Sequence, residues 1–331
     1  MALFCYNKNQ KTDIHDMVIK QLKQAIQKRR SLETVTNAIR LVNGKGDGLP
    51  GLVIEQYNRH FVIHFYNPEA KRYLDEAANY IKTEFNPAFL IIKDRLSSER
   101  TSLDNPKMRI VIEKEKPQTV VVENGLKFRV DLNDTVNSGL FLDTRHIRKR
   151  IGSEARGKSV LNCFAYTCSF GVYARCFGAN RVINVDISRK NLEKGMKNYE
   201  LNGLSFEPGN FNRRDCIEYL KKAGKKNNSF DMIILDPPSF SRTGGKVFSV
   251  EKHLSCLIEM ASNILSPSGL LFVSTNWSAM STNQLKTLVL KKASGLKKNV
   301  LSTEVFSQDI DFSGSGFMKE SSLAAVLTKF A

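Results

Sequence analysis

Apolar runs separated by stretches of helical periodicity fill residues 158–275, and this alternation constrains the fold more than any other feature. The runs read SVLNCFA, RVINVDI, FDMIILD and GLLFVST, and each has the length of one strand. Strands that alternate with helices form parallel sheets, because each helix carries the chain back across a face of the sheet. The sequence therefore predicts an α/β fold, with a mostly parallel sheet that helices cover on both faces.

A smaller domain of α+β structure is expected over residues 36–118. Apolar runs between Gly-rich turns indicate strands in its first half, a helical pattern follows, and a further strand ends near Asp94. The polar stretch 95–118 is expected to be a loop. A second domain is expected over residues 119–331, and it begins with a β-hairpin whose two-residue turn is Asn124-Gly125.

Residues 1–35 are expected to form a basic, partly helical leader. Apolar residues recur at helical spacing between Val18 and Ile26, and lysine and arginine occupy the other faces. Two interpretations stay open, namely a helix that contacts RNA and a solvated amphipathic helix that packs on the next domain. The residues assigned to RNA contact are Lys28, Arg29 and Arg30.

The charge of the chain indicates a polyanionic partner. The 331 residues include 50 Lys and Arg against 33 Asp and Glu, which gives a formal net charge of +17. Such an excess favours nucleic acid, because each neutralised phosphate releases counterions, although a basic surface can also serve solubility. No apolar run approaches the roughly 20 residues that cross a bilayer, and no secretory signal is evident, so a cytoplasmic protein is expected. The six cysteines show no metal-binding spacing, so neither a metal site nor a disulfide framework is expected.

Acidic residues follow three successive strands of the predicted sheet. Asp186 ends the second strand, Asp215 follows the third, and Asp236-Pro237-Pro238 follows the fourth. Ligands of open parallel sheets bind beyond the carboxyl ends of the strands, where an acid can hold ribose hydroxyls. Any one of these acids could instead cap a helix or a turn. The loop NCFAYTCSFG after the first strand lacks the glycines that bring backbone close to a pyrophosphate, so a nucleoside without phosphates, such as S-adenosylmethionine, is expected.

Four segments of the chain resemble a known family: LNCFAYTCSFGVYA, VDISRKNLEKGMKNYELNG, DPPSFS and NSGLFLDTRHIR. They are similar to class I S-adenosylmethionine-dependent methyltransferases that modify bacterial 23S ribosomal RNA, and the resemblance covers roughly residues 36–331. It implies a Rossmann-like, seven-stranded, mostly parallel methyltransferase sheet preceded by the small domain. The partner it implies is 23S ribosomal RNA or a pre-ribosomal particle.

The resemblance also implies roles for individual residues. Asp186 is expected to accept hydrogen bonds from the ribose hydroxyls, and Asp215 is expected to face the adenine amino group. Asp236 is expected to lie between the donor methyl and the target base. Where relatives commonly read YTGS, this chain has Cys168 in place of the glycine, which implies either a strained loop or an altered affinity. The cofactor residues that the resemblance implies are Asn162, Phe164, Tyr166, Asp186, Asp215, Asp236, Phe141, Asp143 and Arg145.

The chemistry of the acceptor atom separates two branches of this family. Methylation at C5 of cytosine needs a cysteine thiolate that adds to C6, and neither strand end where relatives carry it holds a cysteine here. The nearest candidate, Cys216, is interpreted as part of the core. Guanine N7 already has a lone pair and needs only in-line positioning. We therefore expect guanine-N7 transfer, with Asp236 and Phe240 holding the base and Pro237 and Pro238 stiffening the backbone.

Three alternatives stay open at this point. They are cytosine-C5 methylation, adenine-N6 methylation, which related enzymes perform with an Asp/Asn-Pro-Pro-aromatic run, and a non-catalytic role in RNA binding and ribosome assembly.

Overall fold

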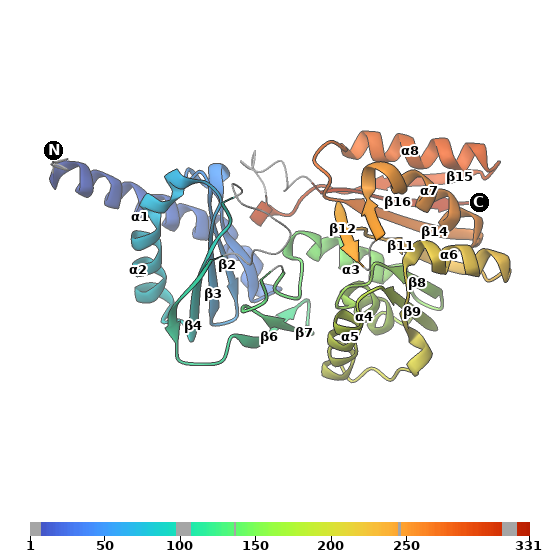
Figure 1. The fold of residues 1–331 in the computed structure, drawn as a ribbon, viewed down its shortest axis with the longest axis horizontal. Coiled ribbons are helices and arrows are strands. Elements are labelled where there is room, and N and C mark those ends of the chain that lie inside the picture. The colour runs from blue at the N-terminus through green and yellow to red at the C-terminus, as the bar shows by residue number, and fades with distance from the viewer. Residues whose placement is uncertain (1–7, 97–106, 136, 244–245, 313–322) are drawn as a thin grey trace. The chain divides into compact units, whose positions relative to one another are not determined.

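The computed structural model describes residues 8–96, 107–135, 137–243, 246–312 and 323–331. Within these ranges the chain divides into two compact units, and each is described by itself (Figure 1). The first unit takes its described residues from 1–125, 129–142 and 309–318, and the second from 126–128, 143–308 and 319–331.

The first unit is a five-stranded sheet with helices packed on one face. The strands are β1 (Ala38–Asn43), β2 (Leu52–Tyr57), β3 (His60–Phe65), β4 (Phe89–Asp94) and β5 (Met108–Glu113), in that order. The β3–β4 pair is parallel and the other pairs are antiparallel. The helices are α1 (Lys8–Arg29) and α2 (Leu74–Phe85). A two-stranded sheet, β6 (Gln118–Glu123) with β7 (Leu126–Asp131), contains the predicted hairpin turn.

Two features of this unit differ from the sequence-based expectation. The stretch 95–118 is not wholly a loop, because β5 pairs with β4 along the edge of the sheet. The leader helix α1 lies in the core of the unit, where Val18, Leu22 and Ala25 are buried against the sheet. Of the two interpretations of this helix, its apolar face therefore fits packing on the adjoining domain.

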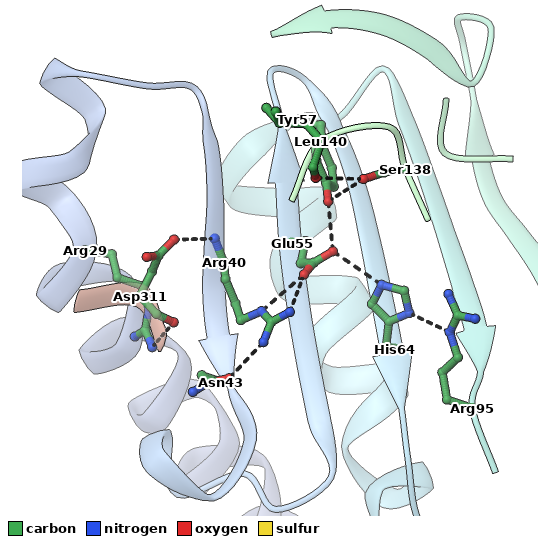
Figure 2. Close-up of polar contacts among 10 residues, drawn as sticks. All are labelled: Arg29, Arg40, Asn43, Glu55, Tyr57, His64, Arg95, Ser138, Leu140 and Asp311. Carbon is green, nitrogen blue, oxygen red and sulfur yellow. Dashed lines mark hydrogen bonds and ion pairs between the residues drawn. The ribbon is translucent and has the colours of Figure 1, made fainter. Parts of the chain in front are cut away.

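A buried polar network joins β1, β2 and β3 through the carboxylate of Glu55 (Figure 2). Arg40 donates to Glu55 Oε1 from Nε at 3.1 Å and from Nη2 at 2.7 Å, and the Tyr57 hydroxyl donates to Oε2 at 3.0 Å. His64 Nε2 lies 3.5 Å from the same Oε2, while Arg95 Nε donates to His64 Nδ1 at 3.3 Å. Because Nδ1 accepts, the imidazole proton is on Nε2 and points to the carboxylate.

Burial alone would raise the pKa of Glu55, but the charge of Arg40 and the hydrogen bond from His64 hold it well below its usual range. Burial lowers the pKa of His64. Both groups bind protons more readily in the unfolded chain, so the stability that they contribute is present above their unfolded pKa values and is lost as the pH falls. We therefore expect this unit to lose stability first below about pH 6.5, through His64, and further below about pH 4.5, through Glu55.

Replacing Glu55 with glutamine should destabilise the first unit by about 3 kcal/mol, because it removes the carboxylate that accepts two hydrogen bonds from the partly buried guanidinium of Arg40. Urea unfolding, with amide hydrogen exchange of β1–β3, measures the loss. The matched control is Glu113→Gln on β5, an exposed carboxylate whose loss should change the free energy of unfolding by less than about 0.5 kcal/mol. Equal effects of the two substitutions would contradict the assignment.

The second unit is a seven-stranded sheet with helices on both faces (Figure 1). The strand order is β10-β9-β8-β11-β14-β16-β15, parallel from β10 through β14, with β16 antiparallel to both of its neighbours. The strands are β8 (Ser159–Cys163), β9 (Arg181–Asp186), β10 (Phe211–Arg213), β11 (Phe230–Leu235), β14 (Leu265–Thr275), β15 (Val300–Val305) and β16 (Ala324–Phe330). The helices are α3 (Arg145–Ser153), α4 (Ser169–Cys176), α5 (Arg189–Leu201), α6 (Cys216–Lys225), α7 (Val250–Asn263) and α8 (Thr282–Gly295).

Successive residues of β11 show how the sheet is covered on both sides. Met232 and Ile234 pack into the core that contains residues of α3 and α4, whereas Ile233 and Leu235 pack into the core that contains residues of α6, α7 and α8. This alternation follows from the period of two residues in a strand. The predicted α/β class and the mostly parallel, seven-stranded sheet are confirmed. No helix in the described part of the chain is long and apolar enough to cross a membrane.

Candidate active site

The order of chain crossings places a ligand site at β8. From β8 the chain proceeds to β9 and β10 on one side, and it then returns to β11 on the other side. Loops that leave β8 and β11 therefore diverge at their carboxyl ends, and ligands of parallel α/β sheets bind at such points. The residues that follow β8, β9 and β11 are thus the first candidates for function.

The loop after β8 has an unusual backbone. Phe164, Tyr166 and Cys168 all have left-handed φ angles, of 56°, 48° and 60°. Side chains of L-residues disfavour this region by about 1–2 kcal/mol each, so the surroundings must hold the loop in place. The Tyr166 amide donates to Asp186 Oδ2 at 2.8 Å, and the Phe164 amide donates to Cys216 Sγ at 3.1 Å. Such over-determined backbone strain is concentrated at ligand sites.

Cys168 occupies the position where the resemblance implies glycine, and the implied backbone strain is present there. The residue is the N-cap of α4 and is fully buried. Burial raises the pKa of its thiol, and the nearby charge of Asp186 raises it further. On α5, a Cβ atom added to Gly195 would lie only 2.4 Å from Cys168 Sγ. The sulfur therefore fills space that the glycine leaves open.

Replacing Gly195 with alanine should destabilise the chain by about 1–3 kcal/mol through this overlap, although alanine normally favours a helix. Adding Cys168→Gly should restore much of the lost stability. Glycine removes the sulfur and adopts the left-handed φ angle without steric strain. Thermal unfolding of the single and double variants measures the coupling. Gly295→Ala on α8 is the control, since nothing lies within 4 Å of its added Cβ. Strictly additive effects would show that the sulfur contact is not the cause.

Asp186 joins the loops that follow β8 and β9. Its Oδ2 accepts the Tyr166 amide, and its Oδ1 accepts the Ser188 amide at 2.8 Å and Asn191 Nδ2 at 3.4 Å. Burial raises the pKa of this carboxyl, while the hydrogen bonds from Ser188 and Tyr166 act in the opposite direction. These three donors occupy three of the roughly four lone-pair positions of the carboxylate, so one position on Oδ2 remains for a further donor. An acceptor fixed at this strand end suits a ribose hydroxyl, so the carboxylate fits a nucleoside cofactor.

Asp215 has a structural role that is independent of any ligand. It is the N-cap of α6, and its Oδ1 accepts the Glu218 amide at 3.1 Å. The residue is partly exposed at the end of β10. The capping interpretation from sequence therefore applies to Asp215, and a contact with adenine through its other oxygen stays a proposal.

Asp236 follows β11, and its environment raises its pKa. Its Oδ1 accepts the Ser274 hydroxyl at 2.6 Å. The pKa is raised to about 6 by burial and by the negative charge of Asp143, while the bond from Ser274 and the charge of Arg148 act against this rise. A carboxyl that titrates near neutral pH at a strand end is characteristic of functional sites.

The remaining predicted site residues differ in how far their side chains are exposed to solvent. Arg145, at the start of α3, is buried, as is Pro237, whereas Pro238 is exposed. Phe141 belongs to the first unit and is 39% exposed. Phe240 is 54% exposed at the start of β12, while Phe164 packs on Phe248 with ring centroids 5.3 Å apart.

The structure buries two of the predicted site residues. Asn162 does not line a pocket, because its amide is 1% exposed and donates to Asn184 Oδ1 at 2.9 Å in the interior of the sheet. Arg29 is not available to RNA, because it is 2% exposed and donates to both oxygens of Asp47, at 3.0 and 2.7 Å. Lys28 and Arg30 are exposed, and RNA contact stays a prediction for them.

The sequence patterns do not identify Ser274 and Arg148, both of which lower the pKa of Asp236. Ser274 lies near the end of β14, so the strand-end criterion that selected the aspartates would have found it. Arg148 lies one helical turn after Thr144 in α3, and nothing in the sequence connects it with Asp236.

Comparison with known proteins agrees with this site. Residues 110–308 match the family described as S-adenosylmethionine-dependent methyltransferase. The Bacillus subtilis protein YwbD, whose name assigns it provisionally to the ribosomal RNA large subunit methyltransferases, is 33% identical over 86% of this chain and 72% of its own length. Ribosomal RNA large subunit methyltransferase I of Aeromonas hydrophila is 28% identical over 93% of this chain and 79% of its own.

Solved structures show the same relationship. The crystal structure of SMU.776, described provisionally as a methyltransferase and complexed with SAH, has a TM-score of 0.82 and 30% identity, and it covers 96% of this chain and 82% of its own. A Streptococcus mutans structure described in similar terms as SAM-dependent also has a TM-score of 0.82, with 29% identity over 95% of this chain and 81% of its own.

The fold and the strand-end carboxylates define a class I methyltransferase. The chain belongs to the S-adenosylmethionine-dependent methyltransferase family. It is an enzyme whose methyl donor is S-adenosylmethionine, and the predictions of fold class, enzyme class and cofactor are confirmed.

Proposed function

We propose that this chain methylates N7 of a guanine in the RNA of the large ribosomal subunit, by direct in-line transfer. Relatives that carry ribosomal RNA large subunit methyltransferase names match 86% and 93% of the chain, which supports this class of RNA. The net charge of +17 supports a polyanionic substrate.

The observation that carries the choice of acceptor atom is the set of residues after β11 and β14. Pro237, Pro238 and Ser239 follow the first strand, and Asn276 and Trp277 follow the second. Neither strand end therefore offers a thiol that could add to C6 of a cytosine. Among the described cysteines, Cys163, Cys168 and Cys216 are buried, and Cys176 and Cys256 are exposed on helices α4 and α7.

Cys216 is a poor nucleophile. Its thiol is buried, which raises its pKa, and the adjacent thiol of Cys163 raises it further. Its sulfur also accepts the Phe164 amide. A thiol held in this way stays protonated at neutral pH, whereas addition to a cytosine requires the thiolate. These surroundings support a mechanism without a covalent intermediate.

Asp236 suits guanine by its charge and its remaining acceptors. With a pKa of about 6 the carboxylate is ionised at neutral pH, and only one of its oxygens receives the Ser274 hydroxyl. The other can accept from guanine N1–H and the exocyclic amine, while the ring of Phe240 stacks on the base. S-adenosylmethionine, when bound, would supply the methyl group, whose bond to sulfur would break as the bond to N7 forms. Guanine N7 carries a lone pair and no proton, so no residue needs to act as a base beforehand.

The proposal is tested by methyl transfer from labelled S-adenosylmethionine to large-subunit RNA from cells that lack the protein. Mass analysis of the nucleosides should find 7-methylguanosine. RNA that contains 7-deazaguanine should accept no methyl group, whereas RNA that contains 5-fluorocytosine should be methylated normally and form no covalent adduct. 5-Methylcytidine or a trapped adduct would establish cytosine-C5 transfer instead, and N6-methyladenosine would establish the adenine alternative. RNA binding without any transfer would point to the assembly role.

A further inference from the structure

A short β-hairpin begins at Phe240, one of the candidate base-binding residues. It pairs β12 (Phe240–Thr243) with β13 (Lys246–Ser249), with Ser241 opposite Phe248 and Arg242 opposite Val247. Residues opposite one another in an antiparallel pair share a face, and successive residues alternate between faces. Phe240, Arg242 and Val247 therefore share one face of the hairpin, and Phe248 lies on the other.

The face that carries Phe248 is anchored to the protein. The Phe248 ring lies 5.3 Å from that of Phe164, in the loop after β8, and it stacks on His253 of α7 at 5.2 Å. The Ser249 amide donates to His253 Nδ1 at 3.1 Å, and the Val250 amide donates to the Ser239 carbonyl at 3.1 Å. The hairpin is therefore held beside the loop of the cofactor site.

The opposite face presents aromatic, cationic and apolar groups to solvent. Phe240 and Val247 are each 54% exposed, and Arg242 is also exposed. The guanidinium of Arg242 lies 5.4 Å from the centre of the Phe240 ring. An aromatic ring beside a guanidinium plane is the combination on which proteins stack unpaired nucleobases, and the arginine also pairs with phosphate.

The exposed face of the hairpin lies within reach of a nucleotide next to the proposed target base. Phe240 follows Asp236 by four residues, so their Cα atoms are at most about 14 Å apart. Arg242 lies two residues further along the same face, which is about 7 Å. Groups at this distance can reach a nucleotide that adjoins one held at Asp236 and Phe240.

We propose that Arg242 and Val247 bind the nucleotide next to the methylated one, with the base stacked on the guanidinium and the side chain of Val247. This proposal rests on the proposed function, because it requires a single-stranded RNA substrate. The charge of the face and the net charge of the chain favour RNA over a protein partner. The contact makes Arg242 a specificity residue for the substrate, separate from the groups that contact the cofactor.

The test compares Arg242→Ala, Arg242→Lys and Arg156→Ala in methyl transfer to protein-free large-subunit RNA. Arg156 is an exposed arginine in the turn before β8. It precedes its strand, whereas Arg242 follows the carboxyl end of β11, so its variant should behave as the unchanged chain. Arg242→Ala should raise KM for RNA about tenfold, with kcat and the affinity for S-adenosylmethionine unchanged. It should also reduce the slope of the logarithm of RNA affinity against the logarithm of salt concentration (the salt slope) by about one. Arg242→Lys should keep the salt slope but still raise KM, because an ammonium stacks poorly.

A second measurement uses an RNA fragment with an abasic site next to the methylated nucleotide. It tests whether Arg242 contacts that neighbouring base. The unchanged enzyme should bind the abasic RNA about tenfold more weakly on one side of the target, whereas Arg242→Ala should show no further loss. Unchanged KM in Arg242→Ala would overturn the proposal, and so would an abasic penalty that persists in this variant. An effect seen only with assembled ribosomal particles would indicate a protein contact and would also overturn it. Absence of any transfer by the unchanged enzyme would instead contradict the proposed function.

Discussion

Replacing Asp236 with alanine is expected to reduce methyl transfer by roughly 10²-fold or more while the fold and most of the cofactor affinity persist. The carboxylate is proposed to hold the target base in line with the donor methyl, and misplacement of a reacting group by about 1 Å can cost roughly 10²-fold in rate. The more conservative change Asp236→Asn should be nearly as damaging, because the amide presents a donor where the base requires an acceptor. Single-turnover rates with saturating RNA and S-adenosylmethionine measure both effects.

The pH dependence of the rate separates this role from a structural one. The pKa of Asp236 is about 6, so the rate should rise as the pH increases towards this value and should level off above it, where the carboxylate is ionised. Ser274→Ala removes the hydrogen bond that lowers this pKa, so the inflection should move to higher pH. Asp236→Asn should lose the inflection. An unchanged inflection in Asp236→Asn would assign the titration to another group.

Replacing Asp186 with alanine should weaken the binding of S-adenosylmethionine by roughly 10²-fold or more. A hydrogen bond to a charged acceptor contributes about 1.5–3 kcal/mol, and the loss of the Tyr166 amide bond releases a loop that has three left-handed residues. Titration calorimetry with the cofactor measures the affinity. Far-ultraviolet circular dichroism should show that the sheet persists.

Asp215→Ser is the matched comparison for Asp186. Serine keeps the N-cap of α6 but removes the carboxylate, so any loss of affinity reports contact with the cofactor rather than damage to the helix. We expect a smaller loss than for Asp186→Ala. Affinity within threefold of the unchanged chain for Asp186→Ala would remove Asp186 from the cofactor site.

The sequence predicts most of the methyltransferase sheet, because alternation of strands and helices is a local pattern. The acids at the ends of β9 and β11 were found for the same reason, since the carboxyl end of a parallel strand is visible in the pattern. The hairpin β12–β13 was not predicted. Its strands have four residues each, which is too short for a periodicity to be recognised, and helical periodicity is expected between the apolar runs on either side of it.

Errors about single residues arose where the partner is distant in sequence. The family resemblance implies a cofactor role for Asn162, but the residue lies opposite Asn184 in the parallel register of β8 and β9, and the two amides bond within the sheet. Arg29 resembled a solvent-exposed basic residue, but Asp47 in the turn after β1 neutralises it. Neither pairing follows from a local pattern, because each depends on how separate elements pack.

The short helix η7 (Ile310–Phe312) belongs to the first unit although it follows α8 and β15 in the chain. Asp311 accepts the Arg40 amide at 3.2 Å, and the Phe312 ring lies 4.1 Å from the Arg40 guanidinium. During synthesis from the amino end, β1 therefore lacks these contacts until the ribosome has made residues 143–308. The second unit must in turn wait for β16. Each unit therefore reaches its final form only after a late segment of the sequence has been made, η7 for the first unit and β16 for the second.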